Sequence, residues 1–240
     1  MLRMHDIVTK WGDLYLPGVE LYADRALVLS GAAVVQDGPI DSYLDYLRSV
    51  GVGAREVIRV PGASPVRAAL ENSALAGRMM RMAHRYGGLQ FFDVSADEEQ
   101  LMRQFALSPE LIFNPTAKVA RCAGNKADLR RFGARLGRTD DFPEHYLVSG
   151  ELGQVFGAIG RLFNSACDFV VLKVPALASG DGMLRVDREH DWPEVVQEFL
   201  DGIDAPEVIV EAGFEHVPMS VQWELSSGGA RMVCAADQLI

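Results

Sequence analysis

The first half of the chain alternates short apolar runs with longer stretches of helical spacing, and this alternation constrains the fold more than any other feature of the sequence. The predicted strands are 26–31, 57–60 and 89–94, and the predicted helices are 40–50, 65–86 and 97–107. Parallel strands need a crossover connection, usually a helix, whereas antiparallel strands can be joined by a tight turn. The alternation therefore predicts an α/β fold, with a parallel sheet covered by helices on both faces.

The second half carries strands that lie closer together in sequence. Its predicted helices are 125–136, 151–163 and 192–200, and its predicted strands are 168–173, 183–186, 207–211, 217–225 and 230–235. Strands at this spacing favour antiparallel pairing, so the region is expected to be α+β. Pro109 and Pro115 separate the two patterns, and the predicted domains are 1–117 and 118–240.

Composition and charge narrow the classes of function. Among 240 residues, 33 are acidic and 23 are Lys or Arg, and the formal net charge of −10 disfavours nonspecific binding to nucleic acid or to an anionic membrane. The three cysteines are widely spaced, as in reduced thiols, and no two of the five histidines have the i, i+4 spacing of a helical metal site. No apolar run approaches the roughly 20 residues that span a bilayer. We expect a cytoplasmic protein that binds small molecules.

Two lysines and a glycine loop are candidate ligands for an anion. Lys126 lies at the start of a predicted helix, and Lys173 ends an apolar strand that would hold its ammonium at the mouth of a cleft. The loop that follows brings two glycines, a hydroxyl and a carboxylate together, so its N–H groups can approach a phosphate. These residues are Ser179, Gly180, Asp181 and Gly182. A simpler interpretation stays open, in which the lysine at the end of the strand is solvated and the glycines form a hairpin turn.

The run 208–216 is a second candidate, because an apolar strand leads into two carboxylates, an aromatic ring and a histidine. These side chains are Glu211, Phe214, Glu215 and His216. Such a strand exit can line a purine pocket, where backbone groups pair with the edge of the base and a ring packs on its face. A surface turn with solvated side chains explains the same residues equally well.

P-loop and dinucleotide sites are disfavoured. The sequence contains neither a Walker A lysine loop nor a G-x-G-x-x-G fingerprint. Residues 30–35, which follow the first predicted strand, contain a single glycine, too few for close approach of the backbone to a pyrophosphate. A dinucleotide-binding α/β enzyme is therefore the least favoured hypothesis, after the two that are given below.

Three successive segments resemble motifs of the ATP-grasp superfamily. They are Asn125–Gly137, Phe169–Gly182 and Val210–Val221. In order, they resemble the family's lysine-headed helix, its strand lysine with a flexible glycine loop, and its hinge with the adenine-binding strand. The preceding segment is similar to the Rossmann-like pre-ATP-grasp domain. The resemblance implies a Rossmann-like parallel-sheet domain followed by part of an α+β ATP-grasp domain.

The resemblance assigns the phosphate contacts of ATP. Lys126 and Lys173 would contact the α and β phosphates, and the loop residues 179–182 would fold over the β and γ phosphates. Enzymes of the superfamily hold Mg²⁺ through an acidic residue and an Asn-x-Arg type segment beyond the hinge strands. No such segment precedes Ile240, so the resemblance places the metal ligands beyond residue 240.

The resemblance also assigns the contacts to the base and the ribose. Glu211 and Ala212 would form the hinge that reads the edge of the adenine, with Phe214 close to the base. Either Glu215 or His216 would meet the ribose, in a segment where Pro218 replaces the acid found in some members of the family.

The activity implied by the resemblance is that of a ligase, which joins a carboxylate to an amine or a thiol through an acyl phosphate. This chain would then be the N-terminal portion of the enzyme. The recognisable motifs do not identify the acceptor substrate. A homodimer is compatible with the sequence. The second hypothesis is a non-catalytic module, in which the same scaffold binds a nucleotide or a partner protein.

Overall fold

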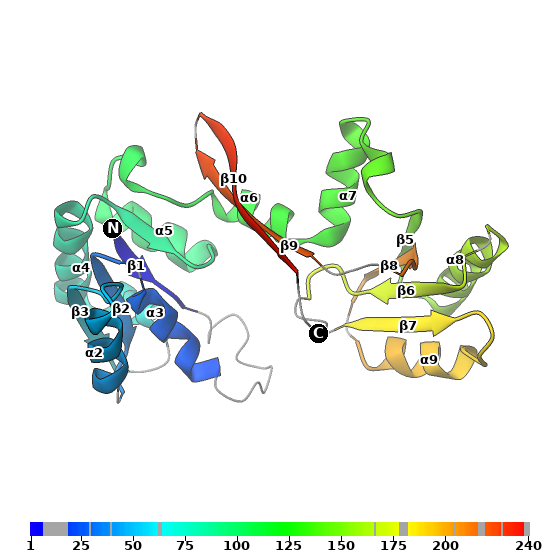
Figure 1. Cartoon of the computed structure of the whole chain (residues 1–240), viewed down its shortest axis with the longest axis horizontal. Coiled ribbons are helices and arrows are strands. Elements are labelled where there is room, and N and C mark those ends of the chain that lie inside the picture. The colour runs from blue at the N-terminus through cyan, green and yellow to red at the C-terminus, as the bar shows by residue number, and fades with distance from the viewer. Residues whose placement is uncertain are drawn as a thin grey trace. The chain divides into compact units, whose positions relative to one another are not determined.

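The computed structural model consists of two compact units (Figure 1). It describes residues 1–6, 19–28, 30–38, 40–61, 64–165, 167–177, 182–203, 205–215, 219–226 and 228–237. Unit 1 is Met1–Gly124 and unit 2 is Asn125–Ile240. Helix α6 (Ala117–Gly124) belongs to unit 1, so the division between the units follows this helix, whereas the boundary proposed from the sequence falls after its first residue.

Unit 1 contains the predicted parallel sheet. Its strands are β1 (Leu2–Met4), β2 (Ala32–Gln36), β3 (Glu56–Val60) and β4 (Leu89–Phe91). They lie in the order β3-β2-β1-β4, and every neighbouring pair is parallel. The chain moves outward from β1 to β3 and then returns to the other side of β1 to form β4. The carboxyl ends of β1 and β4 therefore meet where the strand order reverses.

The start of this sheet differs from the prediction. The first residues of the predicted strand 26–31 end the 3₁₀ helix η1 (Val19–Leu27), and strand β2 begins at Ala32. Ala26 and Leu27 are fully buried in a small core beside β2, so the apolar run covers the sheet. The prediction was wrong because a short buried run has the same pattern in a helix and in a strand. Strand β1 was not predicted, since three residues are too few to show a period.

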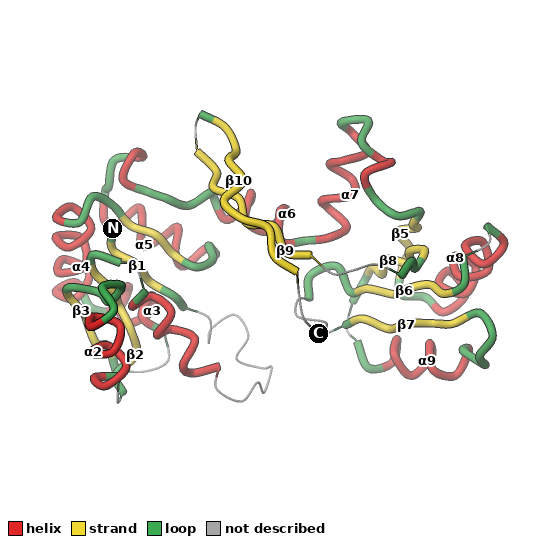
Figure 2. The backbone as a smooth tube through the Cα atoms, in the orientation of Figure 1, coloured by secondary structure: helices red, strands yellow, loops and turns green. Residues whose placement is uncertain are grey.

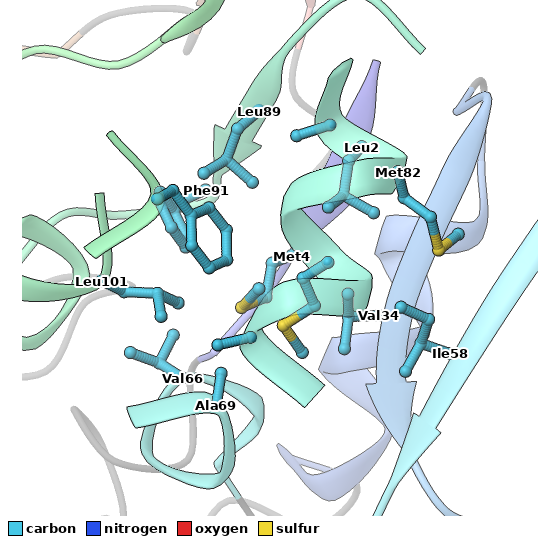
Figure 3. Close-up of a cluster of buried hydrophobic side chains, with 14 of the residues drawn as sticks. Leu2, Met4, Val34, Ile58, Val66, Ala69, Met82, Leu89, Phe91 and Leu101 are labelled. Carbon is cyan, nitrogen blue, oxygen red and sulfur yellow. The ribbon is translucent and has the colours of Figure 1, made fainter. Parts of the chain in front are cut away.

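Helices cover both faces of the sheet. They are α2 (Asp41–Ser49), α3 (Pro65–Glu71), α4 (Ser73–Arg85) and α5 (Ala96–Phe105), followed by the 3₁₀ helix η2 (Pro109–Leu111). The single helix predicted at 65–86 is two helices, because Asn72 has an extended backbone and its side chain caps α4 by accepting the N–H of Leu75 at 3.0 Å. The main core lies between the sheet and α3, α4 and α5 (Figure 3). A smaller core lies beneath η1 and α2.

Unit 2 contains an antiparallel sheet, which confirms the mixed α/β fold class predicted for the chain. Its strands are β5 (His145–Ser149), β6 (Phe169–Lys173), β7 (Met183–Asp187) and β8 (Glu207–Ala212), and its helices are α7 (Lys126–Arg135), η3 (Thr139–Asp141), α8 (Leu152–Asn164) and α9 (Pro193–Asp201). The strand order is β5-β8-β6-β7, with antiparallel neighbours throughout. Strand β5 was not predicted, because its half-buried residues show no alternation.

The two faces of this sheet differ in chemistry, because successive side chains of a strand point to opposite faces. Apolar side chains on one face, among them Val170, Leu172 and Val210, form a buried core with α8 and α9. The alternate positions carry Lys173 and Glu211 on the opposite face. The polar groups of the candidate site lie on that second face.

The last two strands form an antiparallel ribbon of β9 (Met219–Ser226) and β10 (Gly229–Asp237) (Figure 2). These strands confirm the predicted pair over 219–225 and 230–235, and residues 217–218 of the predicted strand 217–225 lie outside the described residues. The opposed apolar residues are Val221 with Ala235, Trp223 with Met232, and Leu225 with Ala230. They share one face of the ribbon, and their side chains are exposed. Within the described ranges, no helix has the length and apolarity needed to cross a membrane.

Candidate functional site

A pocket of about 460 Å³ lies on the polar face of the sheet in unit 2. Its lining residues come from α7, the segment before β5, the strands β6 and β7, and the exit of β8. They are Arg130, Pro143, Phe169, Val171, Lys173, Met183, Arg185, Glu211, Ala212, Gly213, Phe214 and Glu215. The pocket therefore contains five residues of the predicted nucleotide site together with cationic and aromatic residues that were given no role.

A buried carboxylate joins two cations at the base of this pocket. Glu211 is 4% exposed, and its two carboxylate oxygens accept hydrogen bonds from Arg130 and Lys173. Arg130 is 8% exposed, while the side chain of Lys173 keeps 20% of its surface open. Lys173 reaches Glu211 across the β6–β8 ladder, because Glu211 is paired with Val171, two residues before the lysine. The two cations and the one carboxylate leave a net positive charge beside the pocket.

Lys126 belongs to the same charged region. Asn125 caps helix α7 by accepting the N–H groups of Ala127 and Asp128, and this places Lys126 in the first turn. Its ammonium donates to the carbonyl of Leu177, and its backbone N–H donates to Pro175 at 3.0 Å. Burial lowers the pKa of Lys126, the charges of Lys173 and Arg130 lower it further, and Glu211 opposes them. These couplings show that the two predicted lysines lie in one electrostatic neighbourhood.

An aromatic ring and a guanidinium form one wall of the pocket. Arg185 of β7 lies over the ring of Phe169, with 3.7 Å between its guanidinium carbon and the ring centroid. Gly213 permits the backbone to pass close by, since a Cβ there would lie 2.1 Å from this ring. Phe214 is 56% exposed and also lines the pocket. The wall therefore presents the guanidinium of Arg185, which covers the largely buried ring of Phe169.

The structure locates the remaining predicted residues in different ways. Ser179, Gly180, Asp181 and His216 lie outside the described residues. Gly182 has a φ of +63° and packs its Cα side against Val174, and its carbonyl accepts the N–H of Val174 at 2.7 Å. The N–H of Ala212 donates to Glu144 at 2.8 Å, so this amide is already used within the protein. Glu215 forms an ion pair of 3.2 Å with Arg185 at the rim.

Sequence reasoning missed three charged or aromatic residues of the pocket, which are Arg130, Phe169 and Arg185. Arg130 follows Lys126 by four positions on one helix, and this spacing places both side chains on one face. Phe169 alternates with Lys173 along β6, and Arg185 is paired with Val171 across the β6–β7 ladder. The helical spacing and the strand alternation were both visible in the sequence. The pairing across the ladder was not, because it depends on the register of two strands.

The described residues of this pocket do not form a metal site. Among the described residues, no cluster of three or more His, Cys, Asp or Glu side chains could hold one. The carboxylate of Glu211 is engaged by two cations, and Glu215 pairs with an arginine. No chemical step in this pocket is therefore assigned to Mg²⁺.

Solved structures with the same architecture identify the fold. One is an N5-carboxyaminoimidazole synthase from Aspergillus clavatus in complex with ADP and 5-aminoimidazole ribonucleotide, with a TM-score of 0.53, 12% identity, and coverage of 87% of this chain and 53% of that one. Another is the biotin carboxylase domain of 2-oxoglutarate carboxylase from Hydrogenobacter thermophilus with MgADP, ADP and bicarbonate, with a TM-score of 0.50, 16% identity, and coverage of 98% and 49%. Both are ATP-grasp enzymes. This chain has an ATP-grasp fold.

The ATP-grasp likeness is one of structure. The chain spans about half the length of these two proteins. No protein-family model matches the sequence, and no curated protein matches it.

Proposed function

We propose that unit 2 binds ATP in the pocket between β6, β7 and the exit of β8, and that the protein acts as an ATP-dependent ligase. The observation that carries the proposal is the cationic group formed by Lys126, Lys173 and Arg130 next to the aromatic wall of one pocket. A nucleotide needs both features, since its phosphates require positive charge and its base requires an apolar face.

The proposed placement follows the chemistry of each side of the pocket. The phosphates would lie toward Lys126 and Lys173. The base would lie beside Phe214 and the guanidinium of Arg185, which covers the ring of Phe169. Two proteins of like fold are described with ADP, which supports a nucleotide as the ligand.

The proposed reaction is the joining of a carboxylate to an amine or a thiol. A carboxylate oxygen attacks the γ-phosphorus of ATP, ADP leaves, and the amine or thiol then displaces phosphate from the acyl carbon. In this reaction the lysines would orient the phosphates and offset their charge, which is the main demand of phosphoryl transfer. The acyl phosphate would be protected from hydrolysis by exclusion of water from the pocket.

Titration calorimetry with ATP tests the proposal. We expect saturable binding to the 240-residue chain and a loss of affinity of about tenfold or more in Lys173→Ala, as for one charge-assisted contact. Lys118→Ala is the matched control, because Lys118 is an exposed lysine of unit 1 and its loss should leave the affinity unchanged.

A titration with adenosine separates the two ends of the ligand. Adenosine should bind Lys173→Ala and the unaltered chain with similar affinity, because the substitution removes a phosphate contact. Equal weakening of ATP binding by Lys118→Ala and Lys173→Ala would mean that the attraction is nonspecific. An absence of ATP binding to the unaltered chain would refute the proposed site.

A further inference from the structure

Unit 1 contains a pocket of its own, of about 370 Å³, beside the second half of helix α5. One wall comes from this helix, and the other comes from the segment 106–116 that follows it. The volume falls within the range of about 300–1,000 Å³ that is usual for small-molecule sites. All of its lining residues belong to unit 1, so it shares none with the nucleotide pocket of unit 2.

Both walls are anchored in unit 1. Helix α5 contributes to the main core. The second wall is bonded to β4, where the N–H of Phe113 donates to the carbonyl of Leu89 at 2.9 Å. The side-chain amide of Asn114 accepts the N–H of Phe91 at 2.7 Å and donates to the carbonyl of the same residue at 2.9 Å. These bonds hold the two walls in place, so the pocket is formed before a ligand binds.

The interior of the pocket is apolar. Leu107 is buried, and the half-buried side chains of Met102 and Ile112 pack against the main core. Pro115 adds a further apolar group to the lining. A hydrocarbon group that enters the pocket loses contact with water, and the hydrophobic effect favours this transfer.

Two opposite charges line the same pocket, because Glu99 and Arg103 lie four positions apart on α5. The Nη1 of Arg103 is 3.9 Å from the Oε2 of Glu99, which is too far for a hydrogen bond. The other oxygen of Glu99 accepts the N–H of Ala117 at 2.7 Å. Their side chains are 70% exposed for Arg103 and 30% exposed for Glu99, so a solute can reach both. The pair therefore presents hydrogen-bond donors and a carboxylate acceptor beside an apolar interior.

We propose that this pocket binds a free α-amino acid with an apolar side chain. The carboxylate of the ligand accepts hydrogen bonds from the guanidinium of Arg103, and its ammonium donates to Glu99. Its side chain lies against Met102 and Ile112. An α-amino acid carries its two charges on neighbouring atoms of one short group, which suits a cation and an anion 3.9 Å apart. A peptide separates its terminal charges and a fatty acid lacks the ammonium, so neither meets all three requirements.

NMR of the 240-residue chain with labelled methionine methyl groups tests the site. The chain is titrated with L-leucine in the absence of nucleotide, and the resonance of Met102 is assigned from Met102→Leu. We expect a saturable shift of this resonance, with the other methionines as internal controls. Leucinamide lacks the carboxylate, 4-methylpentanoate lacks the ammonium, and glycine lacks the apolar side chain. Each should bind about tenfold or more weakly than leucine, because each loses one of the three contacts.

Substitutions assign each charge of the ligand to its partner. Arg103→Met should weaken the binding of leucine about tenfold or more and leave that of leucinamide nearly unchanged, since leucinamide has no carboxylate to lose. Glu99→Gln should weaken leucine but not 4-methylpentanoate. Arg81→Met is the control, because Arg81 is an exposed arginine of α4 and its removal changes the net charge equally.

The proposal is wrong if leucine gives no saturable shift of Met102, or if the three analogues bind as tightly as leucine. It is also wrong if Arg103→Met and Arg81→Met weaken the binding of leucine equally. The comparison of ligands needs no variant, so it stands even where a substitution disturbs folding. Because no nucleotide is present, the result does not depend on whether unit 2 binds ATP.

Discussion

Arg130 of unit 2 has a carboxylate partner, whereas the described residues give Arg3 of unit 1 none. In unit 2, Arg130 and Lys173 share the buried carboxylate of Glu211. In unit 1, Arg3 has a carbonyl as its hydrogen-bond partner, and the described residues provide no carboxylate for it. The first arrangement compensates a buried guanidinium with a carboxylate, while the second gives the guanidinium of Arg3 a neutral carbonyl acceptor.

The difference predicts different responses to mutation. Removing one member of a buried ion pair leaves an uncompensated charge, which is strongly destabilising. Removing a buried charge that has no partner relieves a cost that the folded protein already carries. The three predictions below test this contrast between the two units.

The largest expected effect is that of Glu211→Gln. The substitution keeps the shape of the side chain but leaves Arg130 buried without a counter-ion, so the free energy of unfolding should fall by about 3–5 kcal/mol. Urea denaturation followed by circular dichroism measures the change. Glu207→Gln is a matched control on the same strand, because the Glu207–Arg131 pair is more exposed and its loss should cost about 1 kcal/mol or less. Equal losses in the two variants would show that Glu211 does not compensate a buried charge.

The next effect is a dependence of stability on pH that originates in unit 1. Burial, followed by the charges of Arg3 and Arg25, lowers the pKa of His5 to about 4 in the folded protein, from an ordinary value near 6.5 in the unfolded chain. Between these values the unfolded state binds the extra proton, so stability falls as the pH drops from about 6.5 toward 4 and is unaffected by His5 above that window. Allowing for solvent screening, the loss should be at most about 2 kcal/mol.

His5→Asn removes the titrating group and should flatten this part of the stability profile. Urea unfolding at a series of pH values compares the variant with the unaltered chain. His190→Asn serves as the control, because His190 is exposed and follows β7 in unit 2. An unchanged profile in His5→Asn would mean that the imidazole is not held neutral by its surroundings.

The smallest expected effect is that of Arg3→Met on the stability of the protein. Because the described residues give the guanidinium no carboxylate partner and the apolar side chain fills similar space, the free energy of unfolding should change by about 1 kcal/mol or less. Urea denaturation measures it. A loss as large as that of Glu211→Gln would indicate that Arg3 is fully compensated within the protein, which would remove the contrast between the units.

The helices and sheet types were predictable because they depend on local patterns. The alternation of apolar and helical stretches indicated the parallel sheet of unit 1, and the close spacing of strands indicated the antiparallel sheet of unit 2. Local patterns gave the wrong secondary structure where burial of an apolar run decided between helix and strand. The apolar pattern of residues 26–31 predicted a strand, although Ala26 and Leu27 lie in a 3₁₀ helix that covers the sheet. Strands β1 and β5 gave no periodic signal of their own.

The candidate site shows the same limit. The sequence singled out Lys126, Lys173 and Glu211 one by one, because each lies at the end of a predicted strand or at the start of a predicted helix. Their common neighbourhood was inferred from a resemblance, and the part played by Arg130 was not inferred at all.

The sequence by itself determined the periodicity of the helices and strands, the residues that cap the helices, and the net charge of this protein. The tertiary structure alone decided which charges meet. Arg130 and Glu211 are separated by 81 residues, and Lys173 and Glu211 by 38. Their contact depends on the register of β6 with β8 and on the packing of α7, and these are properties of the folded chain. Spacing describes the neighbours of a residue within one element, but a long-range contact is selected by the free energy of the whole fold.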